Sequence, residues 1–249
     1  MSEYQWHEAI AQLEPYIFRI YTPDGSGTGW LVSRSKTTPL CVIATASHVL
    51  DHAYYWEEPI RLHHHSSGKA VLLRPGDRAI NIDTVTDTTA IIMNRGELDL
   101  PDVDLPMIKK DYHLKPGVDI GWLGFPAIPW ASLCFFSGHI SAYLDNEAAY
   151  LVDGVAINGV SGGPAFYLIS DSAELIGVVS AYIPNRATGD ILPGVALVRD
   201  VNRFHDLAEG VRTLDEAQAQ QSPPIEPPPP AADAEPGASR RSSGAPPRP

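Results

Sequence analysis

Short apolar runs bounded by turn residues constrain the fold of this chain more than any other feature of its sequence. Runs rich in Val, Ile, Leu and aromatic residues recur along the chain, flanked by Gly, Pro, Asp or Asn. This pattern predicts strands, and because no long helical pattern separates them it disfavours alternating strand–helix units. Strands are expected over residues 16–22, 29–33, 39–45, 69–74, 79–85 or 88–94, 105–109, 118–125, 132–144, 149–153, 164–169, 174–183 and 194–199.

The expected strands form two groups, with a Leu-Lys-Pro-Gly break at residues 114–117 between them. Because each group holds about six strands, we predict an all-β fold of two packed six-stranded antiparallel β-barrels with short terminal helices. The expected units are an N-terminal helix (1–15), a first barrel (16–112), a second barrel (113–205), a C-terminal helix (206–221) and a disordered Pro-rich tail (222–249).

The tail is defined by its composition, since 10 of the 28 residues from Ser222 to Pro249 are proline. Such a segment has little apolar surface to bury and lacks many backbone donors, so we expect it to be extended and solvated. It is also a candidate docking segment for a regulatory partner that binds Pro-rich peptides in an aromatic groove.

Charge and composition exclude several classes of partner. The 249-residue chain carries a net charge of −12, which disfavours binding to the phosphates of nucleic acid. No stretch approaches the roughly 18 apolar residues of a membrane-spanning helix. The first residues also lack the apolar segment of a secretory signal. Cys41 and Cys134 are too few for a disulfide framework, so we expect a cytoplasmic protein with no membrane partner.

The sequence Gly-Val-Ser-Gly-Gly-Pro at residues 159–164 is the sharpest chemical signal. Glycines around a serine let the backbone turn tightly and leave amides bare to face whatever approaches the hydroxyl. Ser161 is therefore a candidate nucleophile, although a glycine-rich β-turn would have a similar composition.

A serine hydroxyl needs a base near neutral pH, and His48, which ends the apolar run 39–45 in our interpretation, is the candidate. A carboxylate on the second imidazole nitrogen would fix the histidine tautomer, and Asp104 stands directly before the apolar run 105–109. The other acids considered for this role are Asp99, Asp102 and Asp119.

The order His, Asp, Ser resembles that of chymotrypsin-like serine proteases. Over about residues 16–205 the chain is most similar to intracellular, bacterial trypsin-like peptidases such as the protease domain of the high-temperature-requirement proteases. The segments that carry the resemblance are Gly25-Ser26-Gly27-Thr28-Gly29-Trp30, Thr45-Ala46-Ser47-His48, Asp104-Leu105-Pro106-Met107-Ile108-Lys109, Ser137-Gly138-His139-Ile140-Ser141-Ala142 and the nucleophile motif at 159–164.

This resemblance implies a serine endopeptidase that acts on a protein or peptide, with His48, Asp104 and Ser161 as the triad. The backbone amides of Gly159 and Ser161 would form the oxyanion hole, and no metal or organic cofactor is required. The implied specificity pocket is uncharged, which favours cleavage after small or medium apolar residues. Its implied residues are Val155, Ala156, Ser180, Tyr182 and Gly194.

Two alternatives stay open. The loop between Pro184 and Pro193 could deliver Asp190 to the pocket and give a preference for basic residues. The chain could also be a catalytically silent protease-like scaffold that binds a peptide or partner protein in the cleft between the barrels.

Other polar clusters are weaker signals. His63-His64-His65 gives no tetrahedral metal geometry, because consecutive residues of an extended segment point in alternating directions, and we interpret it as an exposed loop. His139 is expected in the core or between the barrels, and both cysteines are expected to be small buried hydrophobes.

Overall fold

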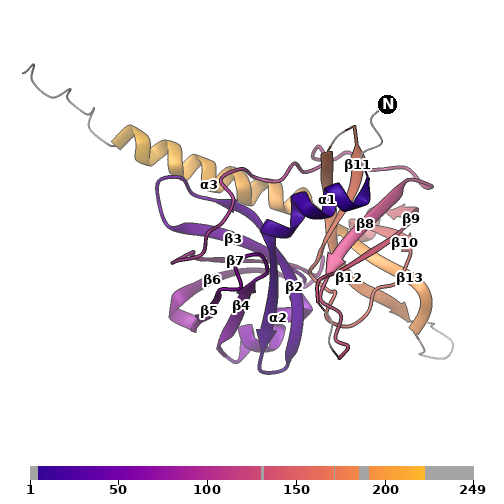
Figure 1. Ribbon diagram of the computed structural model, residues 1–249, viewed down its shortest axis with the longest axis horizontal. Coiled ribbons are helices and arrows are strands. Elements are labelled where there is room, and N and C mark those ends of the chain that lie inside the picture. Colours follow the sequence, from indigo (N-terminus) through magenta and orange to yellow (C-terminus); the bar gives the residue numbers. More distant parts are fainter. Residues whose placement is uncertain (1–4, 130–131, 171, 185–190, 222–249) are drawn as a thin grey trace, which may run out of the picture.

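Two β-sheet units lie side by side and a long helix extends from their junction, as the computed structural model shows (Figure 1). The structure describes residues 5–129, 132–170, 172–184 and 191–221. The tail predicted at 222–249 and the alternative pocket residue Asp190 lie outside these residues. The all-β prediction is confirmed, and the two units differ in how far they close.

The N-terminal unit is a seven-stranded antiparallel sheet in the order β5-β4-β1-β2-β3-β7-β6, which curls without closing into a barrel. It has one strand more than expected, because both alternative runs form strands and residues 60–64 add another, whereas the run 105–109 forms none. The β1–β2 hairpin turns tightly, with Thr22 paired to Gly25. The strands are β1 (Ile17–Thr22), β2 (Gly25–Arg34), β3 (Leu40–Thr45), β4 (Ile60–His64), β5 (Ala70–Leu73), β6 (Arg78–Asp83) and β7 (Thr88–Asn94).

The prediction that the three consecutive histidines form an exposed loop is wrong. β4 pairs with β1, and its alternation turns Ile60, Leu62 and His64 inward. His64 is 1% exposed, with Nε2 2.8 Å from the carbonyl oxygen of Pro15 and Nδ1 2.8 Å from Ser67 Oγ. A buried imidazole with both nitrogens bonded locally is a structural residue.

The C-terminal unit is the predicted closed six-stranded barrel, in the order β10-β13-β12-β11-β8-β9. It closes because β10 pairs with both β13 and β9. The strands are β8 (Asp119–Gly124), β9 (Cys134–Leu144), β10 (Ala149–Asp153), β11 (Pro164–Ile169), β12 (Ser172–Pro184) and β13 (Ile191–Asp200).

The strand expected at 105–109 does not form. This part of the crossover between the two units makes a single parallel bridge, between Met107 and Leu175 of β12. The carbonyl of Pro106 accepts from the Leu175 amide at 2.8 Å, and the Ile108 amide returns a bond to the Leu175 carbonyl at 2.8 Å. Because proline has no amide hydrogen, this segment lacks a donor that a regular ladder requires.

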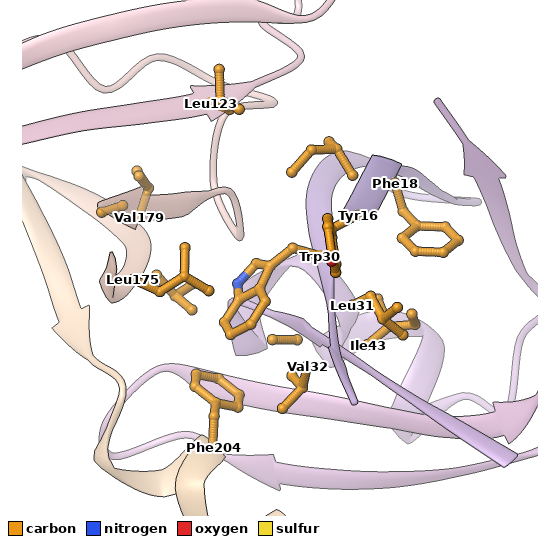
Figure 2. Packing of buried hydrophobic residues seen from close by; sticks show 14 of the residues in the cluster. Tyr16, Phe18, Trp30, Leu31, Val32, Ile43, Leu123, Leu175, Val179 and Phe204 are labelled. Atoms are coloured by element: carbon orange, nitrogen blue, oxygen red, sulfur yellow. The ribbon is translucent and has the colours of Figure 1, made fainter. Parts of the chain in front are cut away.

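Helices join the two units through aromatic packing. Trp6 of α1 packs against Phe135 and Phe166 of the barrel, with ring centroids 5.3 Å and 5.7 Å away. Phe204 of α3 meets Trp30 of β2 edge-on at 5.5 Å (Figure 2). α3 begins earlier than predicted and is unbroken at Gly210. The helices are α1 (Trp6–Leu13), α2 (Ser47–Tyr55), α3 (Asn202–Gln221) and the 3₁₀ turns η1 (Glu14–Tyr16), η2 (Pro75–Asp77) and η3 (Asp145–Glu147).

Candidate active site

His48 lies in the first turn of α2, three residues after the last residue of β3, the strand that it was expected to end. The Asp87 carboxylate caps this turn, because its Oδ1 accepts from the His48 amide at 3.0 Å and from the Ser47 hydroxyl at 2.7 Å. Free amides at a helix N-terminus favour a negative charge, so the helix start and the carboxylate stabilise each other.

The same carboxylate holds the imidazole. His48 Nδ1 lies 2.9 Å from Asp87 Oδ2 and 3.1 Å from Oδ1. The Ser180 hydroxyl, which comes from β12 of the barrel, also donates to Oδ2. Asp87 therefore fixes the ring so that Nε2 is the nitrogen left for chemistry, which is the arrangement that base catalysis by histidine requires.

The prediction that Asp104 orients His48 is wrong. Asp104 Oδ2 accepts instead from the Ser33 hydroxyl at 3.1 Å, and an Arg212 nitrogen lies 4.0 Å away. The physical reason is the missing strand, since the crossover leaves the N-terminal sheet without returning to His48. Asp87 stands directly before β7, so it carries the same local cue, an acid followed by an apolar strand.

None of the other acids considered contacts His48 within the described residues. Asp102 pairs with Arg34, and Asp119 lies 2.9 Å from His139 Nε2. Asp99 lines a separate cavity beside Pro15. His139 itself is 56% exposed on β9, so the expectation of a core position for it is wrong.

Burial and charge act in opposite directions on the two groups. Burial alone would raise the pKa of Asp87, but the hydrogen bonds and charge of His48, with the Ser180 hydroxyl, hold the pKa far below its ordinary value. Burial alone would lower the pKa of His48, but the hydrogen bond and charge of Asp87 and the charge of Asp51 raise it. The pair is therefore an ionised carboxylate beside an unusually basic imidazole.

Ser161 lies in the loop between β10 and β11, and it faces the same cavity as His48, with a volume of about 510 Å³. Its hydroxyl donates to the Ser180 carbonyl at 3.2 Å, and no hydrogen bond to His48 is formed among the described side chains. Other walls of this cavity come from the β1–β2 hairpin, α2, the loop after β8 and the loop before Ser161. They include Tyr21, Thr22, Asp24, Gly25, Ser26, Val49, His52, Ala127, Asn158 and Gly159.

Two glycines of the motif are required by the backbone. Gly159 has φ of +89° and Gly162 has φ of +87°, a region that L side chains rarely adopt. A Cβ on Gly159 would lie 2.3 Å from the Phe125 carbonyl oxygen, and one on Gly162 would lie 2.1 Å from the Thr28 carbonyl oxygen. In the described part of the chain, no acceptor is recorded for the backbone amides of Gly159 and Ser161.

Thr28 of β2 fixes this loop, a role that was not predicted from the sequence. Its amide donates to the Ser161 carbonyl at 2.8 Å, and its hydroxyl donates to the Gly159 carbonyl at 2.8 Å. The Thr45 hydroxyl in turn donates to the Thr28 carbonyl at 2.7 Å. The position of Thr28 in a Gly-x-Gly hairpin was the available signal, since a small-residue hairpin allows close approach of another backbone.

The residues expected to form a specificity pocket come from the loop after β10 and from β12 and β13. Val155 is 49% exposed, Ala156 is half-buried, and Gly194 is exposed with φ of +79°. The Ser180 side chain is buried and turned to Asp87, so only its backbone is available to a pocket. The side chain of Tyr182 lies outside the described part of the structure.

Two kinds of feature are absent from the described residues. No three His, Cys, Asp or Glu side chains there cluster as ligands for a metal ion. No helix there is both long and apolar enough to cross a membrane.

No protein-family model and no curated protein matches the sequence. Solved structures of serine proteases do match the fold. Deg5 is 15% identical, with 80% of this chain and 90% of that chain covered and a TM-score of 0.59. The inactive form of the Rv3671c protease is 16% identical, with 82% and 92% covered and a TM-score of 0.57. The serine endoprotease from Yersinia pestis is 17% identical, with 83% and 66% covered and a TM-score of 0.60. The chain thus has the chymotrypsin-like fold of these proteases.

Proposed function

We propose that this protein is a serine endopeptidase in which Ser161 is the nucleophile, His48 the general base and Asp87 the group that orients His48. The observation that carries the proposal is the Asp87–His48 pair, at 2.9 Å, in the cavity that Ser161 also lines. A buried carboxylate, an imidazole and a serine in one cavity match the roles of a catalytic triad. The fold of the structural neighbours supports the same chemistry.

The proposed reaction starts with a rotation of the Ser161 side chain. Its hydroxyl leaves the Ser180 carbonyl and donates to His48 Nε2 when a substrate carbonyl enters the cavity. Nε2 takes the proton as Ser161 Oγ attacks, and it returns the proton to the leaving amine, which produces an acyl-enzyme. Water then hydrolyses the acyl-enzyme by the reverse sequence of proton transfers.

The backbone amides of Gly159 and Ser161 are proposed to hold the oxyanion. Gly159 is suited to this role because its positive φ is compatible with a bare, close-approaching backbone. Each such donor contributes about 3–4 kcal/mol to transition-state stabilisation in comparable sites. Thr28 would keep both residues in place through its bonds to their carbonyls.

Cleavage after small or medium apolar residues is the proposed specificity. Val155 and Ala156 carry no charge, so a Lys or Arg side chain there would lose hydration without gaining a partner. We also propose a reducing compartment, which is supported by the free thiols of Cys41 and Cys134.

A fluorophosphonate probe tests the enzyme against the alternative of a silent scaffold. The expected result is covalent labelling of Ser161 in the wild-type chain and none in Ser161→Ala. Labelling should also be lost in His48→Ala, because the hydroxyl then lacks its base. An unlabelled Ser161 in the presence of protein substrates, with peptide binding retained, would support the scaffold.

A further inference from the structure

The backbone of Asp87, the residue proposed to orient His48, has an uncommon conformation. Asp87 has φ of +49°, and it ends the tight turn between Asp83 of β6 and Thr88 of β7. Aspartate tolerates the left-handed region better than most residues, but it persists there only when its surroundings hold it. The carboxylate can face His48 only while this turn keeps its shape.

Arg203, the second residue of α3, contacts both ends of the turn. Its Nη1 lies 3.0 Å from Asp83 Oδ2 and donates to the Thr88 hydroxyl at 3.4 Å and the Thr88 carbonyl at 3.5 Å. Its Nη2 donates to the side chain of Asn81. The ion pair is the main contact, because the two bonds to Thr88 are long.

The remaining oxygen of Asp83 shapes the turn from inside. Asp83 Oδ1 accepts from the amides of Val85 at 2.9 Å and Thr86 at 3.2 Å. Arg203 and Asp83 are 27% and 33% exposed, so solvent screens their ion pair only in part. The Arg203 guanidinium therefore fixes the Asp83 carboxylate. That carboxylate in turn fixes Val85 and Thr86, the two residues directly before Asp87.

Arg203 reaches this turn from the other unit. α3 follows directly after β13 of the barrel, whereas β6 and β7 belong to the N-terminal sheet. The contact lines a polar cavity of about 550 Å³ that also holds Lys110. Lys110 pairs with Asp206 at 2.7 Å and makes no recorded contact with the described turn, which makes it a matched control cation.

We propose that Arg203 is a positioning residue for Asp87, which clamps the Asp83–Thr88 turn so that the Asp87 carboxylate stays on His48. The expected effect of Arg203 on kcat rests on the proposed protease function. Its expected effect on the position of the Asp87 carboxylate does not. A residue that only anchored α3 would affect stability and leave the His48 environment unchanged.

The test is an NMR titration of the His48 imidazole in the full chain, with kcat and KM measured in parallel. Arg203→Met is expected to lower the His48 pKa, weaken the Nδ1 proton signal and reduce kcat about 10–100-fold with little change in KM. Arg203→Lys keeps the ion pair with Asp83 and should recover most of both effects. Lys110→Met should change neither.

Guanidinium ions at low concentration should partly restore kcat in Arg203→Ala, because the adjacent cavity admits them. If Arg203→Met does not fold, Asp83→Asn removes the ion pair from the other side and is titrated in the same way. An unchanged His48 titration with only a lowered Tm would overturn the positioning role. If the wild type cleaves no peptide, the protease proposal fails. The titration still shows whether Arg203 keeps the Asp87 carboxylate on His48.

Discussion

The hydroxyl of Thr28 in the N-terminal sheet donates to the carbonyl of Gly159 in the barrel unit, 2.8 Å away. The same hydroxyl accepts from the Phe125 amide at 3.0 Å, and Thr28 is fully buried. One side chain therefore satisfies two buried backbone groups at the junction of the units.

Thr28→Val should be strongly destabilising, because it leaves the Gly159 carbonyl and the Phe125 amide without their partner. The expected cost is about 2–4 kcal/mol, measured as the free energy of unfolding in urea. Activity should also fall, since the loop that carries Ser161 loses a tether. Thr28→Ser keeps the hydroxyl and should retain most of both properties.

Thr89→Val is the matched control for that substitution. Thr89 is fully buried too, but within the described residues its hydroxyl has no hydrogen-bond partner. Replacing it with a methyl group should be neutral or stabilising. Equal losses in the two Val variants would show that the Thr28 bonds contribute nothing specific.

The proposal that Asp87, and not Asp104, orients His48 predicts a large difference between two Asp→Asn variants. Asp87→Asn should lower kcat/KM by about 10⁴-fold, because the amide favours the wrong histidine tautomer. Asp104→Asn should stay within a few-fold of wild type, since Asp104 contacts Ser33 and not His48. The reverse ranking, with purified and folded variants, would restore the original sequence-based assignment.

The raised pKa of His48 sets the pH dependence of activity. Because the base must be neutral, kcat/KM should rise with pH through a midpoint above 6.5. Removing the Asp87 charge leaves burial as the dominant influence on the imidazole. The residual activity of Asp87→Asn should therefore have its acid limb below 6.5, and an upward shift would contradict this account.

Acid stability tests the same carboxylate independently of catalysis. The pKa of Asp87 is depressed from 3.8, so its contribution to stability is present above pH 3.8 and lost as the pH falls through the folded-state value. The Tm of wild type should exceed that of Asp87→Asn near pH 6, and the gap should shrink below pH 3.8. Burial instead raises the pKa of Asp104, so Asp104→Asn should gain in relative stability as the pH rises from 3 to 6. If the Tm difference between wild type and each variant stayed constant with pH, ionisation of these two carboxylates would not be linked to stability.

Specificity can be tested at the exposed position 155. Val155→Asp places a carboxylate in the proposed pocket and should create turnover after Lys or Arg in a positional-scanning peptide library, at the expense of apolar residues. The conservative variant Val155→Leu should keep the apolar preference. Unchanged preferences in both would show that Val155 does not line the pocket.

Local patterns were sufficient to predict the strands of the barrel and the motif at 159–164. Strand alternation and turn preference depend mainly on residues that are adjacent in the sequence. They could not separate Asp87 from Asp104, since each acid precedes an apolar run. The choice depends on which run pairs with β3, and β7 does so from Thr45–Thr89 to Leu40–Asn94. The resemblance to a family motif favoured the wrong run.

His64 and Thr28 show the same limit. The pattern of three histidines before two serines is typical of a loop, but pairing with β1 turns it into a strand and buries the middle histidine. Thr28 has an ordinary residue type in a plain hairpin, and its importance arises only from the approach of a segment more than a hundred positions later. The small-residue hairpin indicates that another backbone can approach it, but one sequence does not indicate which segment does so.

The candidate site is divided between two units that are translated one after the other. His48 and Asp87 precede Ser161, Ser180 and α3 in the chain, so they emerge from the ribosome first. A nascent chain therefore lacks the proposed nucleophile, Ser161, beside the proposed base, His48, until the barrel has been translated. Phe204 of α3 packs on Trp30 of the N-terminal sheet, which is translated earlier. Under the proposed function, peptide-bond cleavage by this chain is thus postponed until the barrel that carries Ser161 has been translated and has folded against the N-terminal sheet.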